Sequence, residues 1–186
     1  MVDQIYDPMS RLHSVLVLIF SILIAQSAGL IGSIATRPNI ETWYRTIEKP
    51  GFTPPDWVFP VVWPTLFLMM GIAAWLVYRS GDQASRLFRG RAASYESMLL
   101  RKPPSQWFAL SIYGIHLLFN VLWSFLFFKW QVVGLAFFEV LLLLVLIIVT
   151  ARMFYHIRPL AGYLMIPYIF WVGYASALNG AIWWMN

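Results

Sequence analysis

The sequence predicts an all-α membrane protein, a five-transmembrane-helix bundle, on three observations. Hydrophobic residues make up 60% of the 186-residue chain and charged residues only 11%, against roughly 45–50% and 25% in soluble domains. Five windows offer the roughly 20 apolar residues that a spanning helix needs. The run 135–149 lacks the alternating polarity of a membrane β-strand. We therefore expect a single integral membrane domain over residues 1–186, with helices near residues 15–34, 58–78, 107–128, 132–153 and 160–184.

The first apolar window, residues 15–34, follows a short polar lead that is not notably basic. Because no small-residue cleavage site is obvious, we interpret the window as a retained helix rather than a signal peptide. Its small residues permit the close approach of another helix, from the same chain or from a second copy. They are Ala25, Ala28, Gly29, Gly32 and Ser33.

Residues 35–56 form a connection that is long for a helical hairpin and rich in aromatic residues and prolines. Loops of this length within a domain are usually functional or disordered. The aromatic content, which includes Trp43 and Tyr44, argues against disorder. We therefore expect a lid loop packed over the mouth of the bundle.

The second helix, near residues 58–78, begins among closely spaced prolines. Thr53 is a suitable N-cap for it, with Pro54 in the first turn. Pro60 and Pro64 stand four residues apart, so we expect both to free carbonyl groups on one helix face. Freed carbonyls within a membrane must be satisfied by neighbours or water. This face is therefore predicted to turn into the bundle, beside a cavity.

Residues 79–105 form the longest polar stretch and are predicted to be a basic cytoplasmic loop. Five spans place the amino terminus, this loop and the last inter-helix connection on one side, which holds nine of the 13 Lys and Arg residues. The positive-inside rule then predicts a cytoplasmic amino terminus. The basic run 86–92 is expected to be solvated, with a short helix on anionic headgroups as the alternative. The net charge of +5 thus indicates orientation rather than nucleic-acid binding.

The last three predicted helices carry a few polar side chains. Asn120 and Asn179 suit either interhelical hydrogen bonds or ligand contact, and the sequence does not choose between them. Glu139 is expected to have a structural role, pairing with Lys129 for example, with a proton or ligand role as the alternative. His116 stands one turn before Asn120 on the same face and is expected to be a hydrogen-bonded core residue.

Part of the total of ten tryptophans stands at the ends of predicted helices, namely Trp107, Trp130, Trp183 and Trp184. Those at helix ends are expected at the level of the lipid headgroups. Trp63, Trp123 and Trp171 fall inside predicted spans instead, and Ala175 and Asn179 follow Trp171 along one helix face. Flat rings beside a proline-containing helix predict a cavity for a flat, apolar ligand.

Several classes of chemistry are excluded by the residues present. The chain has no cysteine, so disulfides and thiolate metal sites are absent. It also lacks a nucleophile–base pair, paired catalytic carboxylates, a glycine-rich phosphate loop and metal-ligand spacing. We therefore predict no catalytic residue of an ordinary hydrolase or transferase and no metal site.

Four separated blocks resemble the translocator protein family, whose members are also called tryptophan-rich sensory proteins or peripheral-type benzodiazepine receptors. The blocks are Trp43-Tyr44…Lys49-Pro50…Pro54-Pro55-x-Trp57…Val62-Trp63; Met70-Gly71; Asn120-x-x-Trp123…Phe127-Phe128; and Pro167-Tyr168-x-x-Trp171…Ala175…Leu178-Asn179…Trp183. They follow in order over nearly the whole chain.

The resemblance implies a homodimer of five-helix bundles that needs no cofactor and binds tetrapyrroles, such as protoporphyrin IX or haem, in a cavity closed by the first loop. Several members also bind cholesterol. Gly180 and Trp184 replace a tyrosine and an arginine linked to cholesterol in animal members, which counts against that ligand here. The ligand-binding residues implied by position are Trp43, Tyr44, Pro54, Trp63, Phe67, Asn120, Trp123, Trp171, Ala175 and Asn179.

We therefore expect a membrane receptor for tetrapyrroles and similar flat hydrophobic ligands that sequesters, senses or transfers porphyrin. One alternative is a porphyrin or sterol transporter, although no inverted repeat is visible. The other is a light- or oxygen-dependent porphyrin-degrading enzyme with Trp63 or Trp123 beside the ring. Expected partners are the ligand, the lipid bilayer and a second copy of the chain, with no nucleic acid. The replaced tyrosine favours a bacterial cytoplasmic membrane over a mitochondrial outer membrane.

Overall fold

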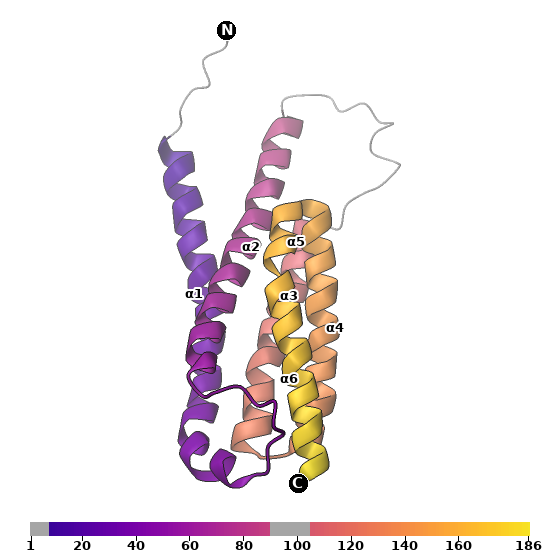
Figure 1. Cartoon of the computed structure of the whole chain (residues 1–186). Coiled ribbons are helices and arrows are strands. Elements are labelled where there is room, and N and C mark those ends of the chain that lie inside the picture. The colour runs from indigo at the N-terminus through magenta and orange to yellow at the C-terminus, as the bar shows by residue number, and fades with distance from the viewer. Residues whose placement is uncertain (1–7, 90–104) are drawn as a thin grey trace.

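The chain folds into a bundle of membrane-length helices, and the computed structural model describes residues 8–89 and 105–186 (Figure 1). Five helical segments in that part are long and apolar enough to cross a membrane. They are Arg11–Tyr44, Val58–Ser80, Gln106–Lys129, Val133–Ile157 and Pro159–Met185. The predicted all-α fold with five spanning helices is therefore confirmed.

The first helix extends beyond the predicted bounds of 15–34. Helix α1 covers Pro8–Asn39 and passes directly into a π-helical turn, η1, at Ile40–Tyr44. The first half of the segment predicted as a lid loop, residues 35–56, is therefore helical. The irregular connection between the first two spans is reduced to residues 47–57.

Proline usually ends or bends a helix because it has no backbone N–H, yet Pro38 lies inside α1. Side chains add hydrogen bonds on both sides of this proline. Asn39 Nδ2 donates to the Ala35 carbonyl at 2.9 Å, and Thr42 Oγ1 donates to the Pro38 carbonyl at 3.1 Å. These side chains donate hydrogen bonds to backbone carbonyls where the ladder changes from α to π, and the helical path continues past the proline.

The second helix, α2, covers Val58–Arg89 and begins later than its predicted cap implies. The Thr53 amide and hydroxyl both donate to the Pro50 carbonyl, at 2.9 and 2.7 Å, so Thr53 closes a turn instead of capping the helix. Pro60 lies in the first turn, where an N–H has no helical partner to lose. Pro64 is therefore the proline that interrupts the interior of the helix.

Helix α2 also ends later than predicted, because residues 79–89 continue it. The amino-terminal part of the segment predicted as a basic loop, residues 79–105, is thus helical. Residues 90–104, with part of the basic run 86–92, lie outside the described residues.

The remaining helices follow the predicted windows with one interruption. They are α3 at Gln106–Ser124 with the π-helical turn η3 at Phe125–Lys129, α4 at Val133–Ile157, α5 at Pro159–Leu164 and α6 at Ile166–Met185. The fifth predicted helix, residues 160–184, is therefore divided at Met165. Pro167 explains the break, since it has no N–H to continue the hydrogen-bond ladder of α5 into α6.

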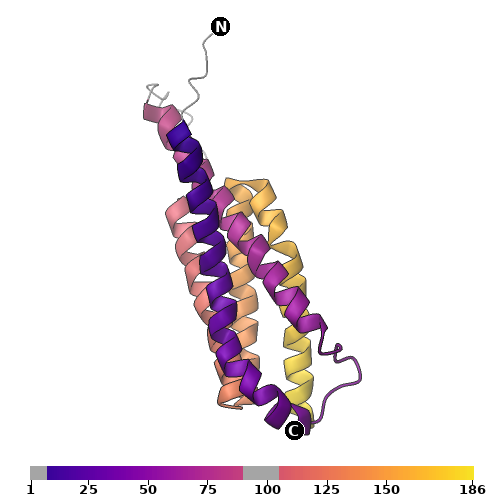
Figure 2. The same ribbon diagram turned by 90° about the vertical axis from the view of Figure 1, so that its left-hand side faces the viewer.

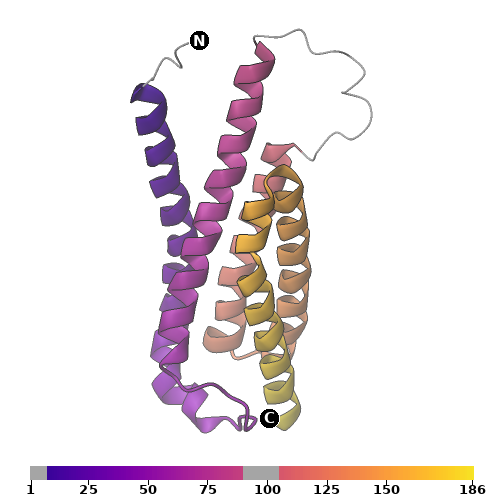
Figure 3. The ribbon, with the colours of Figure 1, turned by 45° about the horizontal axis from the view of Figure 1, so that its top comes forward.

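Helix α1 packs along α2, and α4 packs against both α3 and α6 (Figures 1 and 3). Helix α2 runs obliquely across the bundle (Figure 2). Gly71 permits a close approach of α1, because a Cβ added there would lie 2.6 Å from Ile22 Cα. Gln26 of α1 adds a hydrogen bond at this interface, from Nε2 to the Pro64 carbonyl at 2.9 Å.

Two apolar clusters form the core. The larger one contains residues of all six α-helices, among them the buried side chains of Phe67, Phe154 and Tyr168. The smaller one lies where η1, η3 and the last turns of α6 meet, around Tyr44 and Phe127. Trp123 packs against both clusters and so lies between them. The predicted site residues are distributed over the same two regions.

Candidate functional site

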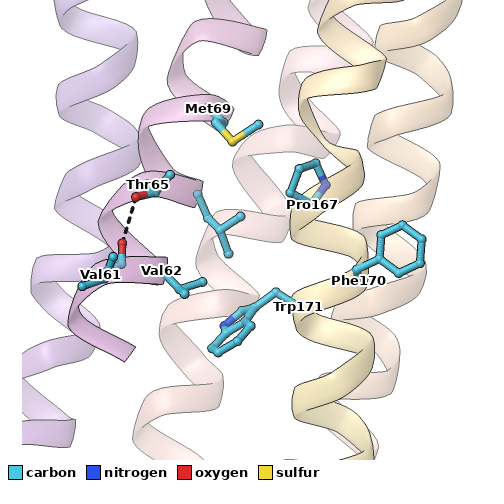
Figure 4. A pocket seen from close by; sticks show the side chains of 8 residues that line it. Val61, Val62, Thr65, Met69, Pro167, Phe170 and Trp171 are labelled. Carbon is cyan, nitrogen blue, oxygen red and sulfur yellow. Dashed lines mark hydrogen bonds between the residues drawn. The ribbon is translucent and has the colours of Figure 1, made fainter. Parts of the chain in front are cut away.

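A groove of about 540 Å³ lies between α2 and α6 (Figure 4). This volume is within the roughly 300–1,000 Å³ of small-molecule sites in proteins. Its walls are Val61, Val62, Thr65, Leu66 and Met69 on α2, with Pro167, Phe170 and Trp171 on α6. The Thr65 hydroxyl donates to the Val61 carbonyl at 2.8 Å, so its hydrogen is already used within the helix and is not offered to a ligand in the groove. The groove therefore suits an apolar ligand.

Aromatic rings stand behind the groove. Trp171, which reaches from α6 toward α2 (Figure 4), meets Trp63 edge-on, with ring centroids 6.4 Å apart and planes at 87°. Trp63 stacks on Phe67 at 5.7 Å and 27°, and contacts Tyr168 at 6.4 Å. Phe59 also contacts Trp171, with ring centroids 5.8 Å apart. The structure thus brings three of the predicted site residues, Trp63, Phe67 and Trp171, into one aromatic cluster.

Asn120 is connected to this cluster through Tyr168. The Asn120 side chain is buried, and its Nδ2 donates to the Tyr168 hydroxyl at 2.8 Å, which joins α3 to α6. A buried polar group within a membrane bundle needs such a partner. The interhelical hydrogen bond, one of the two roles left open by the sequence, is present in this structure.

Trp43, Tyr44 and Trp123 gather in a second aromatic cluster at the η1–η3 end of the bundle. Trp123 stacks on Phe127 with ring centroids 5.2 Å apart, and Trp43 contacts Phe127 at 5.5 Å. Tyr44 contacts Phe128 at 5.6 Å. The predicted site residues are therefore divided between two clusters, one beside the groove and one at the end of the bundle.

Asn179 belongs to the second cluster and has two hydrogen bonds of its own. Its Oδ1 accepts from Trp123 Nε1 at 3.1 Å, and its Nδ2 donates to the Val133 carbonyl at 3.0 Å. The remaining two predicted residues are half-buried: Pro54 lies in the connection 47–57, and Ala175 lies on α6 one turn after Trp171.

The connection 47–57 crosses from the α1–α2 side of the molecule to the end of α6 (Figure 1). The Tyr174 hydroxyl donates to the Phe52 carbonyl, and the two rings are in contact. Lys49 Nζ donates to the Tyr44 carbonyl at 2.6 Å and lies 4.4 Å from the centre of that ring. These contacts hold the connection over the end of the bundle.

Glu139 and His116 are buried and are not among the residues that line the groove. Glu139 is 7% exposed and both carboxyl oxygens are without a hydrogen-bond partner, while Lys129 lies over the ring of Phe125 instead. His116 is fully buried, with Nδ1 3.4 Å from Thr150 Oγ1 and Nε2 without a partner. His116 thus has the core position expected of it, whereas the suggested pairing of Glu139 with Lys129 does not form.

Trp171 was the one groove-wall residue predicted for the site from the sequence, and the structure adds Val61, Val62, Thr65, Leu66, Met69, Pro167 and Phe170. On α2, Val61, Thr65 and Met69 follow a spacing of four residues, and Val62 and Pro167 stand in the blocks that resemble the family. The helical spacing was the available signal, but the same spacing also describes a face turned to lipid.

An apolar groove backed by tryptophans in a five-span helical bundle defines an integral membrane protein of the tryptophan-rich class. The model of the TspO/MBR family matches residues 21–185, and the chain belongs to this family. It is 33% identical to the tryptophan-rich protein TspO of Archaeoglobus fulgidus over 175 residues, which cover 93% of this chain and 99% of the relative.

Two further relatives show the breadth of the family. The tryptophan-rich sensory protein of Cereibacter sphaeroides is 30% identical over 139 residues, 75% of this chain and 73% of the relative. The translocator protein of Homo sapiens is 29% identical over 161 residues, 86% of this chain and 85% of the relative. The family resemblance drawn from the four sequence blocks is confirmed, and it supports a sensory or binding role in the membrane at the level of the family.

Proposed function

We propose that the protein binds flat tetrapyrroles, protoporphyrin IX or haem, at the aromatic-backed groove between α2 and α6. It would act as a membrane receptor that sequesters, senses or transfers porphyrin. The observation that carries this proposal is the arrangement of Trp63, Phe67 and Trp171 beside an apolar groove of about 540 Å³.

The ring geometry suits a flat macrocycle. Trp63 and Phe67 are stacked with 27° between their planes, and Trp171 stands almost perpendicular to Trp63. A macrocycle inserted beside Trp63 would exchange these contacts for stacking of its own, and a favourable aromatic pair contributes about 0.5–1.5 kcal/mol beyond area burial. Trp171 Nε1 is buried without a hydrogen-bond partner, so a carboxylate at the edge of a ligand that displaces the indole would satisfy it.

Equilibrium titration with protoporphyrin IX tests the proposal. Trp63→Leu should weaken binding about tenfold, equivalent to ~1.4 kcal/mol, because it removes the ring against which the macrocycle would stack. Porphyrin fluorescence in purified, detergent-solubilised protein measures the affinity without relying on the replaced tryptophan.

Trp130→Leu is the matched control, since Trp130 is 55% exposed and lies outside the groove, against Phe125. Saturable binding by wild type and Trp130→Leu, with weaker binding by Trp63→Leu, supports the proposal. Equal affinities in all three proteins would place the porphyrin elsewhere, and non-saturable partitioning would exclude it as a ligand.

A second candidate function is light-dependent oxidation of the bound porphyrin by oxygen. The position of Trp171 in the groove wall, in contact with Trp63, favours it, because an excited macrocycle there would take one electron from the indole and pass it to oxygen, and the reduced oxygen species would then oxidise the macrocycle. Illumination should then bleach the porphyrin band faster with protein than with an equal amount of free tryptophan. Equal bleaching would leave binding as the activity of the site.

A further inference from the structure

The end of the bundle beside the groove is closed by a loop that is fastened at two points. Asn186 Nδ2 donates to the Glu48 carbonyl at 3.1 Å, and the Glu48 amide donates to Asn186 Oδ1 at 3.0 Å. Further along the loop, the Tyr174 hydroxyl donates to the Phe52 carbonyl, and the two rings meet with centroids 6.2 Å apart. The two fastenings join the connection 47–57 to Tyr174 on α6 and to Asn186, the residue after α6, so opening this end breaks three hydrogen bonds.

The groove itself opens sideways, away from that end. Val61 on α2 is 58% exposed and Phe170 on α6 is 73% exposed, and both lie within membrane-spanning segments. Exposed faces of spanning helices contact lipid tails. The mouth of the groove therefore faces the apolar interior of the bilayer, where a lipid-soluble molecule is concentrated.

Trp171 connects the wall of the groove to the ring of Trp63. It lines the groove and touches Trp63 and Phe59 through ring contacts of 6.4 and 5.8 Å. Its Nε1 has no hydrogen-bond partner, so turning the indole breaks no hydrogen bond. Movement of Trp171 on the side path therefore breaks no hydrogen bond of that side chain, whereas the end path requires release of the fastened loop.

We propose that the ligand reaches the Trp63 wall sideways from the bilayer, through the groove between α2 and α6, while the connection 47–57 stays fastened. This inference rests on the proposed function and adds the source of the ligand. The protein takes up porphyrin that is already dissolved in the membrane. The groove between α2 and α6 is then the entrance to the binding site, which we call the side port. Trp171 is the side chain that moves to open it.

Because the chain contains no cysteine, a single introduced cysteine can place a plug at a chosen position. Val61→Cys, modified with N-cyclohexylmaleimide, fills the mouth of the groove. Leu68→Cys, modified in the same way, is the matched control, because Leu68 lies on α2, is 41% exposed and is not part of the groove wall. Both proteins are reconstituted into phosphatidylcholine vesicles, and protoporphyrin IX is delivered from donor vesicles.

The readouts are the association rate, from stopped-flow porphyrin fluorescence, and the amount bound at equilibrium. Modified Val61→Cys should associate about tenfold more slowly than modified Leu68→Cys. A Tyr174→Phe/Asn186→Ala double variant, which releases the loop, should associate at the wild-type rate. This pattern supports the side port.

Two results would overturn the inference while leaving the proposed function intact. One is equal association rates of the two modified proteins, and the other is a large acceleration in the loop-release variant, which would place the path at the end of the bundle. Absence of saturable binding in the unmodified protein would instead contradict the proposed function, and the port with it.

Discussion

Asn179 shows how a single buried side chain can hold three elements of this bundle together. It is 1% exposed on α6, accepts a hydrogen bond from Trp123 Nε1 on α3, and donates one to the Val133 carbonyl at the start of α4. Interhelical hydrogen bonds in membranes average about 0.6 kcal/mol each. The larger effect on stability arises when one partner is removed and the other is left buried without a hydrogen bond, which costs about 1–3 kcal/mol.

We predict that Asn179→Leu lowers the free energy of unfolding by about 1–3 kcal/mol, because it leaves the Trp123 N–H and the Val133 carbonyl without partners. Unfolding in mixed micelles by titration with sodium dodecyl sulfate measures the loss. Asn120→Leu is the comparison, since it removes one bond, to Tyr168, and should cost less. A larger loss for Asn120→Leu than for Asn179→Leu would contradict this assignment of bonds.

At the scale of elements, the turn between η3 and α4 contains the one non-glycine residue with positive φ in the described chain, Gln131 at φ 57°. The turn is fixed on both sides of it by backbone bonds, from the Trp130 amide to the Phe125 carbonyl at 2.8 Å and from the Val132 amide to the Leu126 carbonyl at 3.0 Å. The left-handed conformation costs a non-glycine residue about 1–2 kcal/mol.

We predict that Gln131→Gly stabilises the protein by about 0.5–1 kcal/mol, since relief of that strain exceeds the added entropy of the unfolded chain. The side chain is exposed, so little packing is lost. The midpoint of thermal unfolding in detergent should rise, and Gln131→Ala, which keeps a Cβ, should not raise it. A lower midpoint for Gln131→Gly would contradict the strain argument.

The five spans could be predicted from the sequence because each needs only about 20 apolar residues. The elements that depend on side-chain hydrogen bonds could not. Pro38 is ordinarily a stop signal, and the helix passes it with added bonds from Asn39 and Thr42. The break at Met165 lies within an apolar run, where hydropathy gives no warning and only Pro167 indicates it.

The candidate site was predictable in part, for a reason specific to membranes. Trp63 and Trp171 stand in the family-like blocks, Phe67 was implied by its position in the resemblance, and the three rings do meet. Val61 and Phe170 were not recognisable, because a groove wall and a lipid-facing surface are equally apolar and leave no contrast along the helix. Val61 and Phe170 line the same groove because of the way α2 crosses the bundle, and this crossing is a property of the tertiary structure.

At the scale of the whole molecule, helix length and charge both bear on orientation. Helix α2 has 32 residues, or about 48 Å at 1.5 Å per residue, against roughly 30 Å of hydrocarbon in a bilayer. Its later part and the beginning of α1 extend beyond the other helices at one end of the molecule (Figures 1 and 3). That end belongs to the side with nine of the 13 Lys and Arg residues, so this side should be cytoplasmic.

The fastened connection 47–57 lies at the opposite end, and we predict that it faces the exterior of a bacterial cell. Gly51→Cys tests this end, because Gly51 is exposed and a Cβ added there meets no atom within 4 Å. Arg158→Cys, exposed between α4 and α5, tests the other. A membrane-impermeant maleimide applied to intact spheroplasts should label Gly51→Cys alone, and permeabilisation should add Arg158→Cys. The reverse order would place the fastened loop in the cytoplasm and contradict the orientation drawn from charge.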